Sequence, residues 1–179
     1  PLAFPFRQLA DGLTVGRAVS GLPLILALQL GERPIAWWLL LLAGLSDAAD
    51  GWLARRAGGG SSWGARLDPL TDKVLIAAPL LWLASTGGLP LWAVWLLLAR
   101  ELLISGWRAQ ASDGAPASRG GKLKTILQFL SLLLLLWPPA WGGHAALVIL
   151  GWWLFWPSLL LALTSAVGYL RPRSGSHRS

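Results

Sequence analysis

The chain has 179 residues, of which 55% are hydrophobic and only 13% are charged. A soluble domain averages about a quarter charged residues, so this composition excludes an ordinary water-exposed surface, and it equally excludes an intrinsically disordered chain. The absence of cysteine excludes a disulfide framework, a thiolate metal site and a cysteine nucleophile. A net charge of +7 would suit nucleic acid, so the positions of the basic residues decide how that charge is interpreted.

Six apolar stretches follow one another along the chain, each of about the 20 residues that a helix needs to cross a bilayer. They cover residues 13–31, 34–54, 69–87, 89–107, 124–141 and 145–169. Clusters of glycine, proline and polar residues separate them, as turn formers and helix stops do. We therefore predict an all-α integral membrane protein with six transmembrane helices. One membrane domain is expected over residues 1–170, followed by a basic tail at 171–179. The start Pro-Leu-Ala indicates a trimmed initiator methionine and no cleaved signal peptide.

Basic residues alternate between the two sides of the predicted bundle. They gather in the N-terminal segment, the second and fourth connections and the tail, at Arg7, Arg55, Arg56, Arg66, Arg108, Arg119, Lys122, Lys124, Arg171, Arg173 and Arg178. The first, third and fifth connections together contain only Arg33. The positive-inside rule then predicts an inner-membrane protein with both termini and the even connections in the cytoplasm. Because topology and an anion-attracting face explain the net charge, no nucleic-acid partner is expected.

Four of the eight acidic residues lie near the connection between the second and third spans. Asp47 and Asp50 are three residues apart near the end of the second span. Asp68 and Asp72 are four apart at the start of the third, so each pair shares one helical face. Crowded carboxylates take up protons or bind cations, and oxygen ligands favour Mg²⁺, Mn²⁺ or Ca²⁺. Ordinary helix-end charges and an ion pathway are the alternatives.

The aspartates belong to one longer pattern. It reads Asp47-Ala-Ala-Asp50-Gly51-Trp-Leu-Ala54-Arg55, then eight residues, then Gly64-Ala-Arg-Leu-Asp68-Pro-Leu-Thr-Asp72. This pattern resembles the signature of the CDP-alcohol phosphatidyltransferases, D-x-x-D-G-x-x-A-R-x8-G-x3-D-x3-D, at every fixed position. The resemblance implies transfer of a phosphatidyl group from a CDP-linked lipid to an alcohol, with release of CMP, by a homodimer with its active site at the cytoplasmic face.

The resemblance also implies roles for individual residues. Asp47, Asp50 and Asp68 would bind two divalent cations, Mg²⁺ or Mn²⁺. Asp72 would ligate metal or act as general base toward the acceptor hydroxyl. The residues expected to bind CDP are Gly51, Ala54, Arg55, Gly64 and Thr14. The two glycines leave room for close backbone approach, and a guanidinium suits a diphosphate oxygen.

Two further segments bear on the acceptor alcohol. They are Ala99-Arg100-Glu101-Leu-Leu-Ile-Ser105-Gly-Trp-Arg108 and Gly121-Lys122-Leu-Lys124-Thr125-Ile-Leu-Gln128. With Leu13-Thr14-Val-Gly-Arg17 they are similar to the family members that join CDP-diacylglycerol to glycerol 3-phosphate, over about residues 12–130. The cations expected to bind the acceptor phosphate are Arg100, Arg108, Arg119, Lys122 and Lys124.

The direction of two neighbouring side chains is also predicted. We expect Arg100 and Glu101 to point in different directions, Arg100 toward the site and Glu101 toward another helix. Positive-inside topology alone is the alternative explanation for Arg119, Lys122 and Lys124. Other acceptors remain open, namely phosphatidylglycerol, as in a cardiolipin synthase, and inositol phosphate. From a different class, the chain could be a transporter or a cation-binding membrane protein.

Overall fold

The computed structural model describes residues 16, 19–56, 64–110 and 119–170, and all regular secondary structure in these ranges is helical. Within them, the side chains at 47–56, 64–72, 107–110, 119–122 and 167–170 are not described. A first helix, Val19–Gln29, precedes five longer ones. These are α2 (Arg33–Arg56), α3 (Gly64–Ser85), α4 (Leu91–Gln110), α5 (Arg119–Leu135) and α6 (His144–Leu170). The predicted all-α class is therefore confirmed for the described residues.

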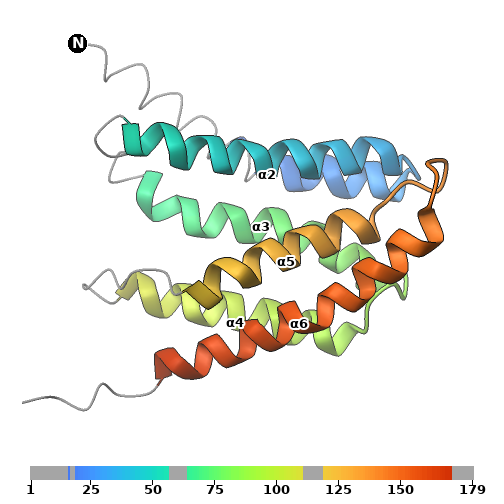
Figure 1. Cartoon of the computed structure of the whole chain (residues 1–179). Helices are drawn as coiled ribbons and strands as arrows, with labels where there is room; N and C mark the ends of the chain where they lie inside the picture. Colours follow the sequence, from blue (N-terminus) through green and yellow to red (C-terminus); the bar gives the residue numbers. More distant parts are fainter. Residues whose placement is uncertain (1–15, 17–18, 57–63, 111–118, 171–179) are drawn as a thin grey trace, which may run out of the picture.

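Successive helices run in opposite directions and form one bundle (Figure 1). One end of the bundle, which we call the motif end, contains the last residues of α2, α4 and α6 and the first residues of α3 and α5. The opposite end, the turn end, contains the connections at 30–32, 86–90 and 136–143. The connections between α2 and α3 and between α4 and α5 fall outside the described residues, but the helix ends that they join are all at the motif end.

Two connections at the turn end are closed by the same backbone motif. Gly31 has φ of 81° and Gly87 has φ of 77°, in the left-handed region that favours glycine. Glu32 N–H donates to Ala27 C=O at 2.8 Å, and Gly88 N–H donates to Leu83 C=O at 2.8 Å. Both are the bond between residues five apart that defines a Schellman helix end. The glycines that were expected to separate the helices therefore end them as predicted.

Three predicted span boundaries in the described ranges differ from the helices by five residues or more, among them the start of the fifth span, which was expected at 124, whereas α5 begins at Arg119. The fifth span was expected to continue to residue 141, whereas α5 ends at Leu135. Trp137-Pro138-Pro139 follows directly, and proline removes a backbone donor and disfavours helix in the residue before it. The third span was expected to begin at 69, whereas α3 begins at Gly64. The first residues of α3, Gly64-Ala-Arg-Leu-Asp68, include two charged residues and are nevertheless helical, so a prediction from hydropathy alone places the start of the helix too late.

Length and composition mark one helix in the described ranges as able to cross a membrane, at His144–Ala166. Shorter apolar stretches occur within other helices, at Val19–Gln29, Arg33–Ser46, Lys73–Ser85 and Leu123–Leu135. Helices are thus present at all six predicted spans, but the crossing of a membrane by all six, and the side on which the termini lie, stay predictions.

Close backbone contacts set how the helices pack. Gly151 of α6 lies so near α5 that an added Cβ would come within 2.9 Å of the Ser131 carbonyl oxygen, and the Ser131 hydroxyl donates to the Gly151 carbonyl at 2.7 Å. Gly44 of α2 faces the ring of Phe129 on α5, where an added Cβ would lie 2.2 Å from a ring carbon. Small residues at such crossings are typical of helices that pack in membranes.

Candidate active site

The aspartate motif occupies the facing ends of α2 and α3. Asp47 and Asp50 lie in the second half of α2, and Asp68 and Asp72 lie in the first half of α3. Both stretches are at the motif end of the bundle (Figure 1). The backbone thus brings the two halves of the motif to one end, while the positions of the four carboxylates fall outside the described side chains.

The contact between Gly44 and Phe129 sets the depth of α2 against α5. From Gly44, the backbone of Asp47 lies about 4.5 Å and that of Asp50 about 9 Å further along the helix toward the motif end, at 1.5 Å per residue. From Phe129, Lys124 lies about 7.5 Å along α5 in the same direction. Lys124 is therefore level with the stretch of α2 that carries the first aspartate pair.

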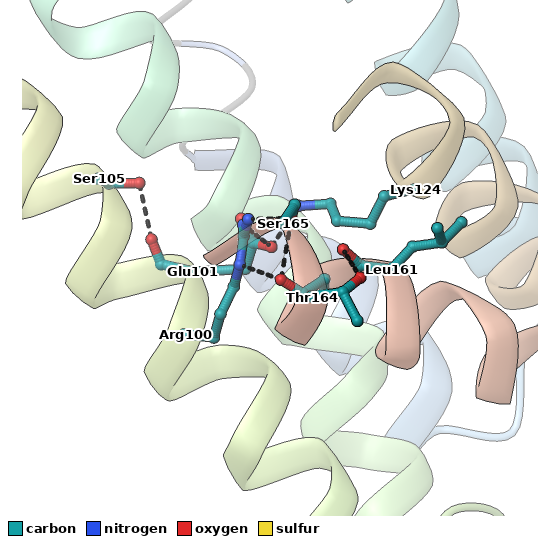
Figure 2. Close-up of polar contacts among 8 residues, drawn as sticks. Arg100, Glu101, Ser105, Lys124, Leu161, Thr164 and Ser165 are labelled. Atoms are coloured by element: carbon teal, nitrogen blue, oxygen red, sulfur yellow. Dashed lines mark hydrogen bonds and ion pairs between the residues drawn. The ribbon is translucent and has the colours of Figure 1, made fainter. Parts of the chain in front are cut away.

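Lys124 belongs to a buried charge cluster with Arg100 and Glu101 of α4. The Glu101 carboxylate accepts from Arg100 Nη1 at 2.9 Å and also from Lys124 Nζ. The three side chains are only 10%, 12% and 8% exposed for Arg100, Glu101 and Lys124 respectively. Figure 2 shows Arg100 and Glu101 on α4, with the Lys124 side chain extending toward them from α5. One carboxylate is therefore shared by two cations.

The Arg100 guanidinium is also bound to α6. Its Nε donates to the Ala162 carbonyl at 2.8 Å and its Nη2 donates to the Ser165 hydroxyl at 2.6 Å. The Ser165 hydroxyl in turn donates to the Ala162 carbonyl at 2.9 Å. Together with the bond from Nη1 to Glu101, three of the five guanidinium N–H groups donate to these partners. One further N–H group is present on each of Nη1 and Nη2. The cluster thus joins α4, α5 and α6 near the motif end.

The structure corrects one prediction and supports another. Arg100 and Glu101 were expected to diverge, and this was wrong, because their side chains pair with each other. Consecutive residues are about 100° apart on a helix, and a long arginine side chain can fold back over that angle. Glu101 was expected to pair with another helix, and its contact with Lys124 of α5 confirms this.

Sequence reasoning missed Ser165. Its signal is weak, because Thr164-Ser165 is a short polar pair in the long apolar sequence of α6, and serine in such a helix commonly bonds its own backbone. The neighbouring Thr164 does only that in the described structure, donating to the Leu160 and Leu161 carbonyls. Gln128 lies one turn after Lys124 on α5 and is 3% exposed, so the same face of α5 stays polar beyond the lysine.

The remaining predicted site residues are placed by their backbone or fall outside the description. Gly51, Ala54 and Arg55 lie in the last turns of α2, and Gly64 is the first residue of α3. Arg108 lies near the end of α4, and Arg119 and Lys122 lie in the first turn of α5, all at the motif end. Thr14 lies outside the described residues. His144, the first residue of α6, lies at the turn end, where its Nδ1 is 2.8 Å from the Trp137 carbonyl oxygen.

Comparison with known proteins supplies the family. The profile of the CDP-alcohol phosphatidyltransferases matches residues 7–164. A protein of Mycobacterium tuberculosis called probable phosphatidylglycerophosphate synthase is 36% identical over 171 residues, which cover 91% of this chain and 80% of that protein. Two proteins called CDP-diacylglycerol–glycerol-3-phosphate 3-phosphatidyltransferase are also similar. That of Rickettsia felis is 30% identical, over 92% of this chain and 94% of its own. That of Salmonella choleraesuis is 34% identical, over 79% and 83%.

The profile match extends over nearly all of the described helices, including both halves of the aspartate motif. The chain belongs to the CDP-alcohol phosphatidyltransferase family.

Proposed function

We propose that the chain transfers a phosphatidyl group from CDP-diacylglycerol to sn-glycerol 3-phosphate, giving phosphatidylglycerophosphate and CMP. The observation that carries this proposal is the similarity to relatives named for that transfer, along 79% to 92% of this chain. The complete aspartate motif on α2 and α3 supports the same chemistry.

The proposed setting is the inner membrane, with six spans and the motif end in the cytoplasm. Large apolar side chains are exposed on all six helices, among them Leu22, Leu42, Leu81, Leu103, Ile126 and Trp153. A soluble surface rarely exposes so many large apolar side chains, whereas lipid tails would cover them. The cytoplasm supplies the water-soluble acceptor and receives the released CMP. The basic residues of the connections support this orientation.

The donor set at the motif end suits divalent cations. Asp47, Asp50 and Asp68 would hold two ions, Mg²⁺ or Mn²⁺, and Asp72 would ligate metal or face the acceptor hydroxyl. Carboxylates in this number with no cysteine or histidine among them match hard cations, which fits the use of divalent metals in the family. When bound, such ions polarise the diphosphate and offset the charge that develops on the leaving CMP.

The residues of the chain then have separate tasks. Gly51, Ala54 and Gly64 leave space for the nucleotide beside the helix ends, and Arg55 takes a diphosphate oxygen. Asp72 accepts the proton of the acceptor hydroxyl as its oxygen forms a bond to the phosphatidyl phosphorus. The bond from that phosphorus to the oxygen of CMP breaks, and CMP leaves with the bonding electrons.

The proposed acceptor site is the cationic side of the motif end. Lys124 and Arg100 carry the buried positive charge there, and both lie in the cluster of α4, α5 and α6. Arg108, Arg119 and Lys122 would add charge nearer the helix ends, where the N-terminus of α5 also favours phosphate. An acceptor that carries a phosphate group matches this excess of cations better than an uncharged alcohol.

A product assay tests the proposal. Purified protein receives CDP-diacylglycerol together with labelled glycerol 3-phosphate, phosphatidylglycerol or inositol phosphate in separate reactions, and the lipids are identified by mass spectrometry. We expect phosphatidylglycerophosphate from the first reaction, only in the presence of Mg²⁺ or Mn²⁺. Product from another acceptor, with none from glycerol 3-phosphate, would refute the proposed acceptor.

A matched variant separates catalysis from binding of cations alone. In Asp72→Asn we expect release of CMP to fall by about 10²- to 10⁴-fold, the range for loss of a general base. A transporter or simple cation-binding protein would release no CMP in any variant. Unchanged CMP release in Asp72→Asn would remove Asp72 from the proton transfer.

The homodimer and the single domain over residues 1–170 stay predictions, which the mass of the detergent complex and a truncation after Leu170 would test.

A further inference from the structure

Glu101 lies where an anion-binding site would least favour it. Its carboxylate sits between two of the cations assigned to the acceptor phosphate, Arg100 and Lys124, and is 12% exposed. A carboxylate repels phosphate, so Glu101 is unsuited to bind the acceptor itself. Two cations close together with little water would also repel each other, and a shared carboxylate offsets that repulsion.

Arg100 is held from the other side by α6. Ser165 accepts from Nη2 and the Ala162 carbonyl accepts from Nε, so both contacts fix the plane of the guanidinium. A fixed guanidinium in turn fixes the Glu101 oxygen, Oε1, to which it donates. Lys124 Nζ donates to that same oxygen. Ser165, Arg100, Glu101 and Lys124 therefore form one continuous series of polar contacts from α6 through α4 to α5 (Figure 2).

We propose that Glu101 and Ser165 are positioning residues for the acceptor site, which hold the Arg100 guanidinium and the Lys124 ammonium group where the acceptor phosphate binds. Lysine has a long side chain with four rotatable bonds, and ordering it before the substrate arrives lowers the cost of binding. The inference rests on the proposed function, because it assumes that these cations bind the phosphate of the acceptor.

The Glu101→Gln variant gives the main test, because charge and position predict opposite results. Removal of the negative charge alone would strengthen binding of an anion and lower the KM for glycerol 3-phosphate. The amide oxygen of glutamine accepts more weakly than a carboxylate and its NH2 group repels the two donors, so Arg100 and Lys124 are held less firmly, and we expect this KM to rise about tenfold, as for loss of a hydrogen bond to a charged group. The KM for CDP-diacylglycerol should change by less than about twofold, since its proposed site is on α2 and α3.

A hydroxyl pair on α6 provides a milder variant with a matched control. Ser165→Ala removes the contact with Arg100, and we expect the KM for glycerol 3-phosphate to rise about two- to fivefold, as for one ordinary hydrogen bond. Thr164→Ala removes the adjacent hydroxyl, whose described bonds go to its own helix, and both KM values should stay unchanged. Both variants keep the charge cluster, so they cover the case in which Glu101→Gln fails to fold.

A double-mutant cycle shows whether Glu101 acts through Lys124. In the Lys124→Gln background, Glu101→Gln should raise the KM for glycerol 3-phosphate by a smaller factor than in the wild-type background, because coupled residues are not additive and only the part that acts through Arg100 remains. Full additivity, an equal rise in both KM values, or a lower KM in Glu101→Gln would each overturn the positioning role.

The two proposals fail in different ways. Wild-type protein that uses a different phosphorylated acceptor would refute the proposed function, and the same variants would then be judged on the KM of that acceptor. Wild-type protein that uses only an acceptor without phosphate would refute both. Normal use of glycerol 3-phosphate with unchanged KM values in Glu101→Gln and Ser165→Ala would refute the positioning role alone.

Discussion

The motif end and the turn end of the bundle are held together by different interactions. At the turn end, the ring of Trp37 meets those of Trp38, Trp137 and Trp141 edge to face, with centroids 5.1, 5.5 and 5.2 Å away. The cation there, Arg33, lies over the Trp82 ring at 5.3 Å. Near the motif end, α4, α5 and α6 are instead joined by ion pairs and hydrogen bonds of charged side chains, with Glu101 shared by two cations and Arg100 bound to α6.

This difference separates stability from chemistry. The tryptophan rings and the glycine turns hold the helix ends together without burying charged side chains. They suit a membrane interface, because an indole has an apolar ring and a polar N–H group. Buried charges are costly to remove from water even when they are paired, so a buried ionic cluster is a poor choice for stability alone. Its position beside the aspartate helices gives it a use in binding, and variants at the two ends should therefore have different effects.

The largest expected effect compares a cation from each end. Lys124→Gln should raise the KM for glycerol 3-phosphate about 10- to 100-fold, because a charge-assisted contact with the phosphate is lost. Arg33→Gln should leave both KM values unchanged and lower the free energy of unfolding by about 0.5 to 1 kcal/mol, the usual size of a cation–π contact. Steady-state kinetics and thermal unfolding in detergent measure the two. Equal KM changes in the two variants would erase the proposed distinction between the ends.

An intermediate effect is expected from the contact that sets the depth of α2 against α5. In Gly44→Ala the new methyl group would overlap the Phe129 ring, so the free energy of unfolding should fall by about 1 to 3 kcal/mol, as for overpacking. Because α2 must also shift, kcat should fall several-fold. The double variant Gly44→Ala with Phe129→Leu should recover both quantities. A double variant no better than the single one would show that this crossing does not control the depth.

The smallest effect is expected at the turn end. Trp37 Nε1 donates to the Leu133 carbonyl at 2.8 Å, and Trp37→Phe keeps an aromatic ring while it removes this bond. The free energy of unfolding should fall by about 0.5 to 1.5 kcal/mol, with kcat and both KM values unchanged. Thermal unfolding and the product assay check this, and a changed KM for glycerol 3-phosphate would link the turn end to the acceptor site.

The sequence predicted the helices better than their contacts. Apolar runs and glycine or proline breaks carry local information, so all six helices were expected, and the errors at α3 and α5 are confined to ends where polarity or proline opposes hydropathy. The grouping of cations from α4 and α5 followed from topology. The partners of Arg100 on α6 did not, because a contact between residues 62 and 65 positions apart depends on how α6 is rotated about its axis. Periodicity within one helix contains no such information.

The burial of Lys124 has a consequence for side reactions. The ammonium side chain is 8% exposed and lies about 7.5 Å inside the start of α5, at 1.5 Å per residue from Arg119. Few water molecules can contact this ammonium group, so an acceptor that binds Lys124 exchanges part of its own hydration shell for ionic contacts. On the proposed function, a donor cleaved in this dry environment meets an acceptor hydroxyl more often than water. The same burial that makes the cluster costly would then protect the CDP-linked lipid from wasteful hydrolysis.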